Sequence, residues 1–594
     1  MQSLIAEHAP YAALAVMLLT FAAFLFERHP PEVTAAGGAA AFVILGLVTP
    51  AEAMAVFSNP APLTIAAMFV LTGALVRAGV LERVAGAIIE LAGDSAVKAV
   101  VLLMVGTMLI AGFVNNTPLV LILIPIAIRI ARKFDIASTR LLIPVSYLTI
   151  LGGACTLIGT STNLLVDGVA REHGLEPFSI FEITPVGIVT ALSGAALLGL
   201  FGRRLLPDRR DAARIGEQGQ PEFLSEAAIL EEGPLTSGPL GEAKALKPHG
   251  VRVLGLRRGE EIFRENLDGF VPRKGDRLIL EASASELLTL AADKALRVGQ
   301  RRPSGLGAAA EAVVAEAVVA PAHAGVGRPI SELGLGGRFG VRVLGAHRHQ
   351  HRPGKDLESV LLRPADRLLL EGPPAGLDAM SQQGFVVSVT RTSGRAFRRA
   401  KAPIAILALL SVVALAALGV MEITVLAMIA TAAILLLRCL DSDEAWGAVD
   451  GSILVLIFSM LIIGAGLQRS GAVDLVVSGV APGLAGLSPA ATLIVVYLLT
   501  SLLTEMITNN AVAVVMSPIV IGLAAQLGLD ARPFLVAVMF AASASFATPI
   551  GYQTNTLVYG AGDYRFADFL KVGIPMNLVV GLATCWAIAA YYGL

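Results

Sequence analysis

Long apolar stretches alternate with short polar interruptions over most of this chain, outside a polar region near its middle. A helix that crosses a bilayer needs about 20 predominantly apolar residues. Several stretches are shorter than this or are interrupted by Gly and Pro, which predicts re-entrant or broken helices besides full spans. The apolar stretches lie at about 10–27, 36–57, 61–80, 97–113, 117–131, 139–158, 181–202, 403–419, 421–440, 452–468, 473–504, 511–527, 533–558 and 568–592.

The polar interruptions follow the same order in the two apolar halves. A tip of paired asparagines (Asn115-Asn116-Thr117, the first tip; Thr508-Asn509-Asn510, the second tip) precedes an apolar run with a proline. A polar motif then follows, at residues 159–163 in the first half and 551–555 in the second. Equivalent positions are 392 to 394 residues apart. Polar groups that break apolar segments at corresponding places in two halves indicate the binding site of a transporter.

Composition supports a membrane protein and excludes several other classes. Hydrophobic residues make up 55% of the 594 residues and charged residues 15%. This is far from the balance of a soluble globular chain. The formal net charge of -1 gives no sign of nucleic-acid binding, and three cysteines cannot form a disulfide framework. We find no nucleophile–base or metal-binding pattern, so we expect no enzyme activity.

The polar region between about 205 and 400 is flanked by basic residues at both junctions. Basic residues beside membrane segments favour the cytoplasmic side, so we expect the region 206–400 in the cytoplasm. The basic residues are Arg203, Arg204, Arg209 and Arg210 on one side, and Arg391, Arg395, Arg398, Arg399 and Lys401 on the other.

This polar region contains a repeat of its own. The segment 250–255 (GVRVLG) recurs at 340–345, and 276–281 (DRLILE) recurs as 366–371 (DRLLLE), both with a separation of 90 residues. Alternating apolar residues bounded by Gly, Pro and Asp predict strands. We therefore expect two small α/β domains, at 206–300 and 301–395, inserted between a first membrane half (1–205) and a second (396–594). Their strand endings resemble the TrkA-C (RCK-C) ligand-binding domains of potassium-uptake regulators.

The chemistry of the tips and polar motifs suits both an anion and a cation. Helix N-termini at hairpin tips expose N–H groups that favour an anion, whereas unwound carbonyls and side-chain oxygens suit Na⁺. Neither tip nor polar motif contains Lys or Arg, and neutral ligands allow an anion to leave again. Glu505, five residues before Asn510, is an intramembrane acid and by default a functional candidate. The alternative is that it lies at the membrane edge and caps the hairpin.

Together these motifs resemble the divalent anion/sodium symporter family (DASS), over about 10–205 and 400–594. The resemblance implies inverted repeats, two re-entrant hairpins, an elevator-type movement and a homodimer in a bacterial inner membrane. The first tip reads Asn-Asn-Thr where the family has Ser-Asn-Thr, and the combination with TrkA-C domains favours sulfate over a dicarboxylate. The implied substrate ligands are Asn115, Asn116, Thr117, Thr160, Ser161, Asn509, Asn510, Tyr552, Gln553 and Thr554. The implied Na⁺ ligands are Asn115, Asn116, Gly159, Asn163, Thr508, Asn509, Asn510, Gly551 and Asn555.

Two other functions stay open on the sequence. One is a Na⁺/H⁺ antiporter or arsenite-type permease of the wider ion-transporter group. The other is an ion channel gated by the TrkA-C pair, although the chain has no Thr-Val-Gly-Tyr-Gly filter. In the leading hypothesis the TrkA-C pair regulates transport and binds a small ligand such as a nucleotide.

Overall fold

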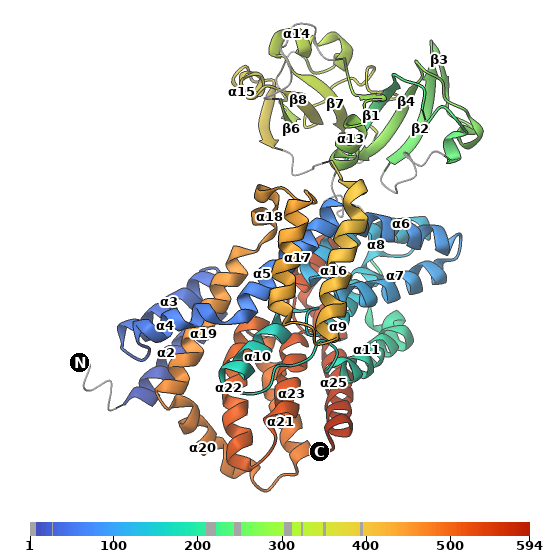
Figure 1. Cartoon of the computed structure of the whole chain (residues 1–594). Helices are drawn as coiled ribbons and strands as arrows, with labels where there is room; N and C mark the ends of the chain where they lie inside the picture. Colours follow the sequence, from blue (N-terminus) through green and yellow to red (C-terminus); the bar gives the residue numbers. More distant parts are fainter. Residues whose placement is uncertain are drawn as a thin grey trace. The chain divides into compact units, whose positions relative to one another are not determined.

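The chain forms two compact units in the computed structural model (Figure 1). The helical unit comprises Met1–Val76, Ile88–Gly216 and Lys401–Leu594, and the sheet unit comprises Arg77–Ala87 and Glu217–Ala400. The structure describes residues 8–26, 28–209, 221–233, 235–242, 251–301, 312–321, 323, 325–348, 352–391, 396–549, 551–562 and 564–594.

Two sets of helices flank the sheet region in the sequence. The first set is α2 (Ala9–Phe26), α3 (Pro31–Ile44), α4 (Pro50–Ala55), α5 (Pro60–Arg77), α6 (Val80–Ala92), α7 (Ala96–Ala111), α8 (Asn116–Lys133), α9 (Leu142–Gly153), α10 (Ser161–Glu172) and α11 (Thr184–Leu205). The second set is α16 (Ala402–Ala417), α17 (Ile423–Leu436), α18 (Ser442–Ala448), α19 (Gly451–Arg469), α20 (Ala472–Leu484), α21 (Pro489–Thr504), α22 (Asn509–Leu527), α23 (Ala531–Ser543), α24 (Gln553–Gly562) and α25 (Phe566–Tyr592).

The helices of the second set follow those of the first in the same order. Helices α3 and α17 begin 392 residues apart, and so do α10 and α24. Thr190 of α11 and its counterpart Thr584 of α25 share a hydrogen bond of 2.8 Å. The last helices of the two sets therefore meet at equivalent positions.

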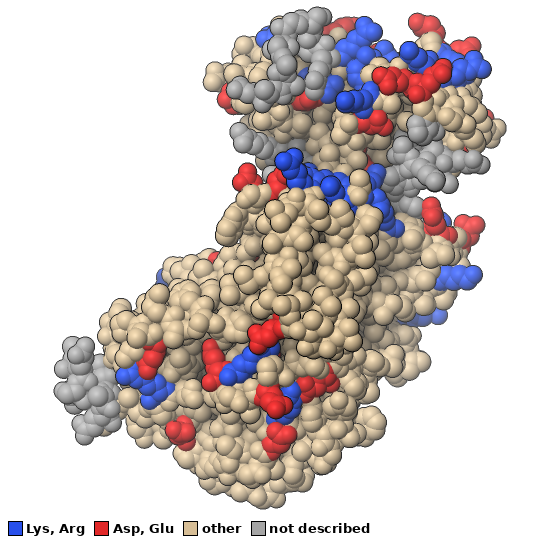
Figure 2. Space-filling view, in the orientation of Figure 1, with Lys and Arg blue, Asp and Glu red and all other residues tan. Residues whose placement is uncertain are grey.

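Length and composition would allow six of the described helices to cross a membrane. They are α5, α11, α16 with the preceding turn, α19, α22 and α25. Side chains that are neither acidic nor basic cover most of the helical-unit surface visible in Figure 2, as expected for contact with lipid.

Three predicted apolar stretches are each divided in the structure. The stretch 36–57 contains the end of α3 and a separate α4, whose N-cap Thr49 accepts a hydrogen bond from the amide of Glu52. The stretch 473–504 is divided between α20 and α21, where the Ser488 side chain caps the new helix. The stretch 533–558 contains a non-helical segment between α23 and α24. Hydropathy alone does not detect these ends, because capping depends on single side chains.

The sheet unit contains an antiparallel sheet whose strands pair in the order β3-β2-β4-β1-β7-β8-β6-β9, with β5 beside β1. Pairing of β1 with β7 at Leu224 and Ala346 joins its two halves. Helix α13 (Ala284–Ala291) follows β4, α14 (Leu335–Phe339) precedes β7, and α15 (Pro374–Gln382) follows β8. The strands are β1 (Glu222–Ile229), β2 (Val251–Arg258), β3 (Glu261–Phe263), β4 (Arg277–Ser283), β5 (Leu296–Val298), β6 (Val313–Val319), β7 (Arg342–His347), β8 (Arg367–Gly372) and β9 (Val386–Arg391).

The 90-residue repeat corresponds to a recurring ion pair inside the sheet unit. Arg258 binds the carboxylate of Asp276 at 2.7 Å, and Arg348 binds that of Asp366 at 2.7 Å. The same guanidinium groups also donate to the carbonyls of Val271 and Leu361 respectively. Arg258 thus fixes the start of β4, and Arg348 fixes the start of β8 in the same way.

The beginning of α6 belongs to the sheet unit through its contacts. The amide of Arg398 donates to the carbonyl of Arg77 at 2.9 Å. Arg399 binds Glu286 of α13 at 2.6 Å. Near this pair lies Glu82, one of whose carboxylate oxygens is buried and has no hydrogen-bond partner among the described residues. Burial raises the pKa of Glu82 to about 7, with a smaller contribution from the charge of Glu286.

Candidate functional site

Both tips and both polar motifs meet at one cavity of about 160 Å³ inside the helical unit. The tips and motifs stand at the N-termini of α8, α10, α22 and α24, and the N-termini of α3 and α19 complete the wall. The cavity is lined by Pro31, Glu32, Asn115, Asn116, Thr117, Gly159, Thr160, Ser161, Ser452, Ile453, Leu456, Thr508, Asn509, Asn510, Gly551, Tyr552 and Gln553.

The first tip contacts the polar motif of the other half. Asn115 caps α8 by accepting a hydrogen bond from the amide of Thr117 at 3.1 Å. The buried Asn116 donates through Nδ2 to the hydroxyl of Tyr552 at 2.8 Å. Thr117 donates to Oε1 of Gln553 at 2.9 Å.

The second tip likewise contacts the polar motif of the other half. Oδ1 of Asn510 accepts hydrogen bonds from Ser161 at 3.1 Å and from Thr162 at 3.3 Å. Asn509 donates to Thr162 at 3.0 Å. Thr160 and its counterpart Tyr552 lie 3.2 Å apart, oxygen to oxygen. Hydrogen bonds between the two halves therefore hold the cavity together.

Three of the predicted ligands lie behind the cavity wall and do not line it. Asn163 donates to the carbonyl of Thr156 at 2.9 Å. Asn555 donates to the carbonyls of Ser545 at 2.8 Å and Thr548 at 3.1 Å. Thr554 accepts a hydrogen bond from Ser146 at 2.8 Å. The two asparagines thus span the breaks that precede α10 and α24.

The two breaks are stabilised by equivalent threonines. Thr156 accepts from the amide of Gly159 at 3.1 Å and donates to the carbonyl of Gly112. Thr548 accepts from the amide of Gly551 at 3.1 Å and donates to the carbonyl of Glu505 at 3.3 Å. This matching geometry explains why both polar motifs contain a glycine four residues before the asparagine.

Glu505 stabilises the second break and is not part of the cavity wall. Its carboxylate accepts hydrogen bonds from the amides of Phe546, Ala547 and Thr548 at 2.8 to 2.9 Å. Asn577 of α25 donates to the same carboxylate at 2.7 Å. A charge with several donors is well satisfied inside a protein. The geometry thus gives this acid a structural role.

Sequence reasoning did not detect the wall that α3 and α19 contribute. Among the described residues that line the cavity, Glu32 is the one charged side chain. It lies in the first turn of α3, directly after two prolines, where an acid is ordinary. The one available signal was the repeat spacing, since these positions and their counterparts begin equivalent helices.

Two matched sets of helices around a polar cavity, with broken helices at its wall, are the architecture of a membrane transporter. The chain belongs to the citrate transporter family, whose model (CitMHS) matches residues 21–532 and 513–593. It is accordingly a multi-pass membrane protein, and its relatives are transporters rather than enzymes.

Similar proteins cover nearly the whole chain. An uncharacterized transporter of Synechocystis sp. is 33% identical over 100% of this chain and 99% of its own length. The uncharacterized transporter YfbS of Escherichia coli is 29% identical over 92% and 93%. Sodium/sulfate cotransporter 2 of Chlamydomonas reinhardtii is 22% identical over 91% of this chain and 85% of its own length.

Proposed function

We propose that this protein is a sodium-coupled symporter that takes up a small divalent anion, with sulfate favoured over a dicarboxylate. The observation that carries the proposal is the convergence of helix N-termini on one cavity. The N-terminus of a helix has unpaired N–H groups and a partial positive charge. Four such termini bind a doubly charged oxyanion without the slow release that a fixed arginine would impose. The sodium/sulfate cotransporter among the relatives supports the same cargo.

The second cargo, Na⁺, needs oxygen ligands that the protein does not otherwise use. Buried oxygens of this kind are Oδ1 of Asn116, Oδ1 of Asn163 and the hydroxyl of Thr508, which have no hydrogen-bond partner within the described part of the chain. Unpaired buried oxygens cost free energy unless a ligand contacts them. These side chains therefore fit Na⁺, and Asn163 would act from behind the cavity wall.

The contacts between equivalent residues support inverted repeats and alternating access. Thr190 meets Thr584, and Thr160 meets Tyr552. Equivalent residues of two copies touch each other where a two-fold axis passes between the copies. A two-fold axis through the cavity and in the plane of the membrane would relate two halves of opposite orientation. The two tips would then be re-entrant hairpins that enter from opposite sides of the membrane.

The remaining expectations belong to the same proposal. Residues 206–300 and 301–395 form two regulatory TrkA-C-like domains in the cytoplasm, which bind a small molecule such as a nucleotide. The transporter works as a homodimer in a bacterial inner membrane. The basic junctions support the cytoplasmic location, and the 90-residue repeat supports a pair of domains. The homodimer, the bacterial inner membrane and the small-molecule ligand rest on the resemblances alone.

Uptake into proteoliposomes tests the proposal. Labelled sulfate, a four-carbon dicarboxylate and citrate are offered separately, with an inward Na⁺ gradient or with choline in its place. We expect concentrative sulfate uptake that requires Na⁺. Equal uptake in choline would contradict the sodium coupling. Na⁺-driven proton movement without an anion would favour the antiporter, and single-channel currents would favour the channel.

A further inference from the structure

The cavity wall contributed by α3 and α19 has a counterpart elsewhere in the helical unit. The repeat spacing of 392 residues relates the wall residues of α3 to residues of α17, and those of α19 to residues of α5. All of these counterparts line a second cavity of only about 10 Å³. The five pairs are Pro31 and Ile423, Glu32 and Thr424, Ser452 and Pro60, Ile453 and Ala61, and Leu456 and Thr64.

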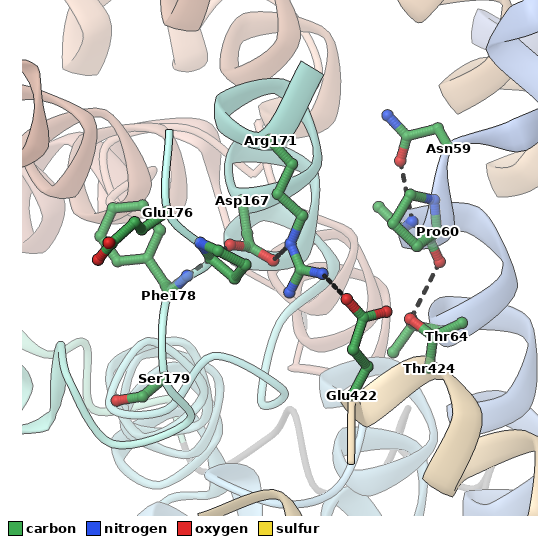
Figure 3. A network of polar contacts seen from close by, with 12 residues as sticks. Asn59, Pro60, Thr64, Asp167, Arg171, Glu176, Phe178, Ser179, Glu422 and Thr424 are labelled. Atoms are coloured by element: carbon green, nitrogen blue, oxygen red, sulfur yellow. Dashed lines mark hydrogen bonds and ion pairs between the residues drawn. The ribbon is translucent and has the colours of Figure 1, made fainter. Parts of the chain in front are cut away.

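Helix α10 fills the space in front of the α5–α17 wall (Figure 3). Leu164, Asp167, Gly168 and Arg171 of α10 line the other side of the small cavity, and Asp167 and Arg171 are labelled on α10 in Figure 3. Gly168 is in close contact with this wall, since a Cβ atom there would lie 2.8 Å from Oδ1 of Asn59 and 2.9 Å from Cβ of Ala61. This wall is therefore sealed.

The corresponding face of α24 is vacant. Thr556 and Gly560 are the counterparts of Leu164 and Gly168, and both are exposed, whereas Leu164 and Gly168 are buried. A Cβ atom at Gly560 would have no atom within 4 Å among the described residues. Helix α24, the counterpart of α10, thus has open space in front of Gly560.

We propose that the vacant face of α24 docks onto the α3–α19 wall in the opposite-facing state of the transport cycle, with Gly560 against Ile453. In the same step α10 leaves the α5–α17 wall, and the cavity opens on that side. Alternating access between inverted repeats moves one bundle against the other. The surface that is covered in one state is then the repeat-related counterpart of the surface that is covered in the other state. The inference rests on the proposed transport function. It specifies two gates: α10 with the α5–α17 wall is the sealed gate, and α24 with the α3–α19 wall is the vacant gate.

Polar contacts of α10, which we call the lock, are present at the sealed gate (Figure 3). Arg171 binds Asp167 at 2.8 Å and reaches Glu422, before α17, at 3.6 Å. Asn59 donates to Glu172 at 2.5 Å. These bonds join α10 to the segments before α5 and α17.

Two residues of the lock are replaced at the corresponding positions of the other gate. The counterparts of Glu422 and Asn59 are Pro30 and Gly451, whose side chains carry no hydrogen-bonding group. The lock therefore stabilises the state with α10 docked over the state with α24 docked. A ligand or a mutation shifts such an equilibrium only by its different effect on the two states.

A cysteine pair tests the docking directly. In a background with Cys155, Cys439 and Cys585 replaced by serine, Ile453→Cys and Gly560→Cys are combined and exposed to an oxidant in proteoliposomes. We expect a disulfide that forms faster when Na⁺ and sulfate are both present, because turnover visits the opposite-facing state. A control pair combines Ile453→Cys with Gly199→Cys, since Gly199 on α11 also has open space around it. This control should not cross-link.

Glu422→Gln tests the lock in the same cysteine background. Without sulfate, it should raise the cross-linked fraction by up to about fivefold, the change that about 1 kcal/mol of lost ion pairing produces. Asp474→Asn, at the start of α20, is the matched control and should leave the fraction unchanged. Equal fractions for both variants would overturn the lock.

Uptake by the wild type separates the two proposals. Sulfate uptake without any cross-link between positions 453 and 560 would overturn the docking and leave the transport function intact. The opposite result is a protein that moves none of the tested anions but forms the cross-link more readily with Glu422→Gln. It would contradict the proposed cargo and support the docking of α24. Gly560→Leu gives a second measurement. It should abolish uptake while Na⁺-dependent sulfate binding persists, whereas Gly199→Leu should retain uptake.

Discussion

Asn116 and Asn510 occupy equivalent positions but use opposite ends of their amides. Asn116 donates through Nδ2 to Tyr552 and keeps a buried Oδ1 unpaired, whereas Oδ1 of Asn510 accepts from Ser161 and Thr162. An asparagine can perform either task because its amide both donates and accepts. One residue type thus serves two unequal halves of the cavity.

Replacing either asparagine should strongly reduce transport without unfolding the protein. Asn116→Ala removes a donor to Tyr552 and an unpaired oxygen, and Asn510→Ala leaves two hydroxyls without their acceptor. Each lost hydrogen bond in a buried site costs about 1–3 kcal/mol. We expect uptake to fall by at least about tenfold, measured per folded protein after size-exclusion chromatography. Ser478→Ala on the exposed side of α20 is the control. Wild-type uptake by both variants would make the tips purely structural.

Glu32 should oppose the anion and favour the cation, because it is the charged side chain in the described lining. Near a protein surface one charge at several ångströms contributes about 1 kcal/mol or more. Glu32→Gln should therefore lower the KM for sulfate about fivefold and raise the Na⁺ concentration for half-maximal uptake. Asp443→Asn on α18 is the control for a general loss of negative charge. An unchanged KM would place Glu32 outside the path of the anion.

At the scale of elements, the break before α24 depends on Glu505. Its carboxylate accepts three backbone amides, and a glutamine there has a single acceptor oxygen. Glu505→Gln should destabilise the protein by about 1–3 kcal/mol for the amides left unpaired. Thermal unfolding measures this change, and uptake should fall in parallel. A variant with unchanged stability but no transport would instead give Glu505 a direct role in the cargo path.

The sequence indicated the motifs that occur in both halves. It was less accurate about which single side chains point into the cavity. Both tips and most of both polar motifs line the cavity. The sequence could indicate them because the same polar residues recur in the two halves, whatever their hydropathy. Asn163, Thr554 and Asn555 lie behind the wall, since successive residues of a helix point in different directions. Glu32 was missed because an acid in the first turn of a helix has an ordinary structural explanation.

At the scale of the whole molecule, the sheet unit should make stability depend on pH through Glu82. Its pKa is raised by burial from 4.5 to about 7, so the folded state binds the proton more tightly than the unfolded state. The resulting stabilisation is complete below about pH 4.5 and is lost as the pH rises through 7. Thermal unfolding of wild type and Glu82→Gln checks this. Glu82→Gln should unfold at a temperature that falls less between pH 5 and pH 8. Parallel curves would show that Glu82 does not titrate in this range.

The sheet region should be dispensable for transport itself. Every residue that lines the cavity or the two walls lies outside residues 217–400. We expect a protein with residues 217–391 replaced by a short flexible linker to retain Na⁺-driven uptake and to lose its regulation. Residues 396–400 are kept because the amide of Arg398 donates to the carbonyl of Arg77, and Phe397 lies against Gly79.

A second deletion, extended through Ala400, isolates the contribution of those contacts. It should lower the unfolding temperature, because the start of α6 loses its partners. Uptake per folded transporter is compared across both deletions and the full chain, together with the oligomeric state. Unchanged kinetics in a monomeric product would make the sheet region an assembly module. Loss of all uptake in a well-folded product of the shorter deletion would show that the translocation path includes part of the sheet region, contrary to the proposed function.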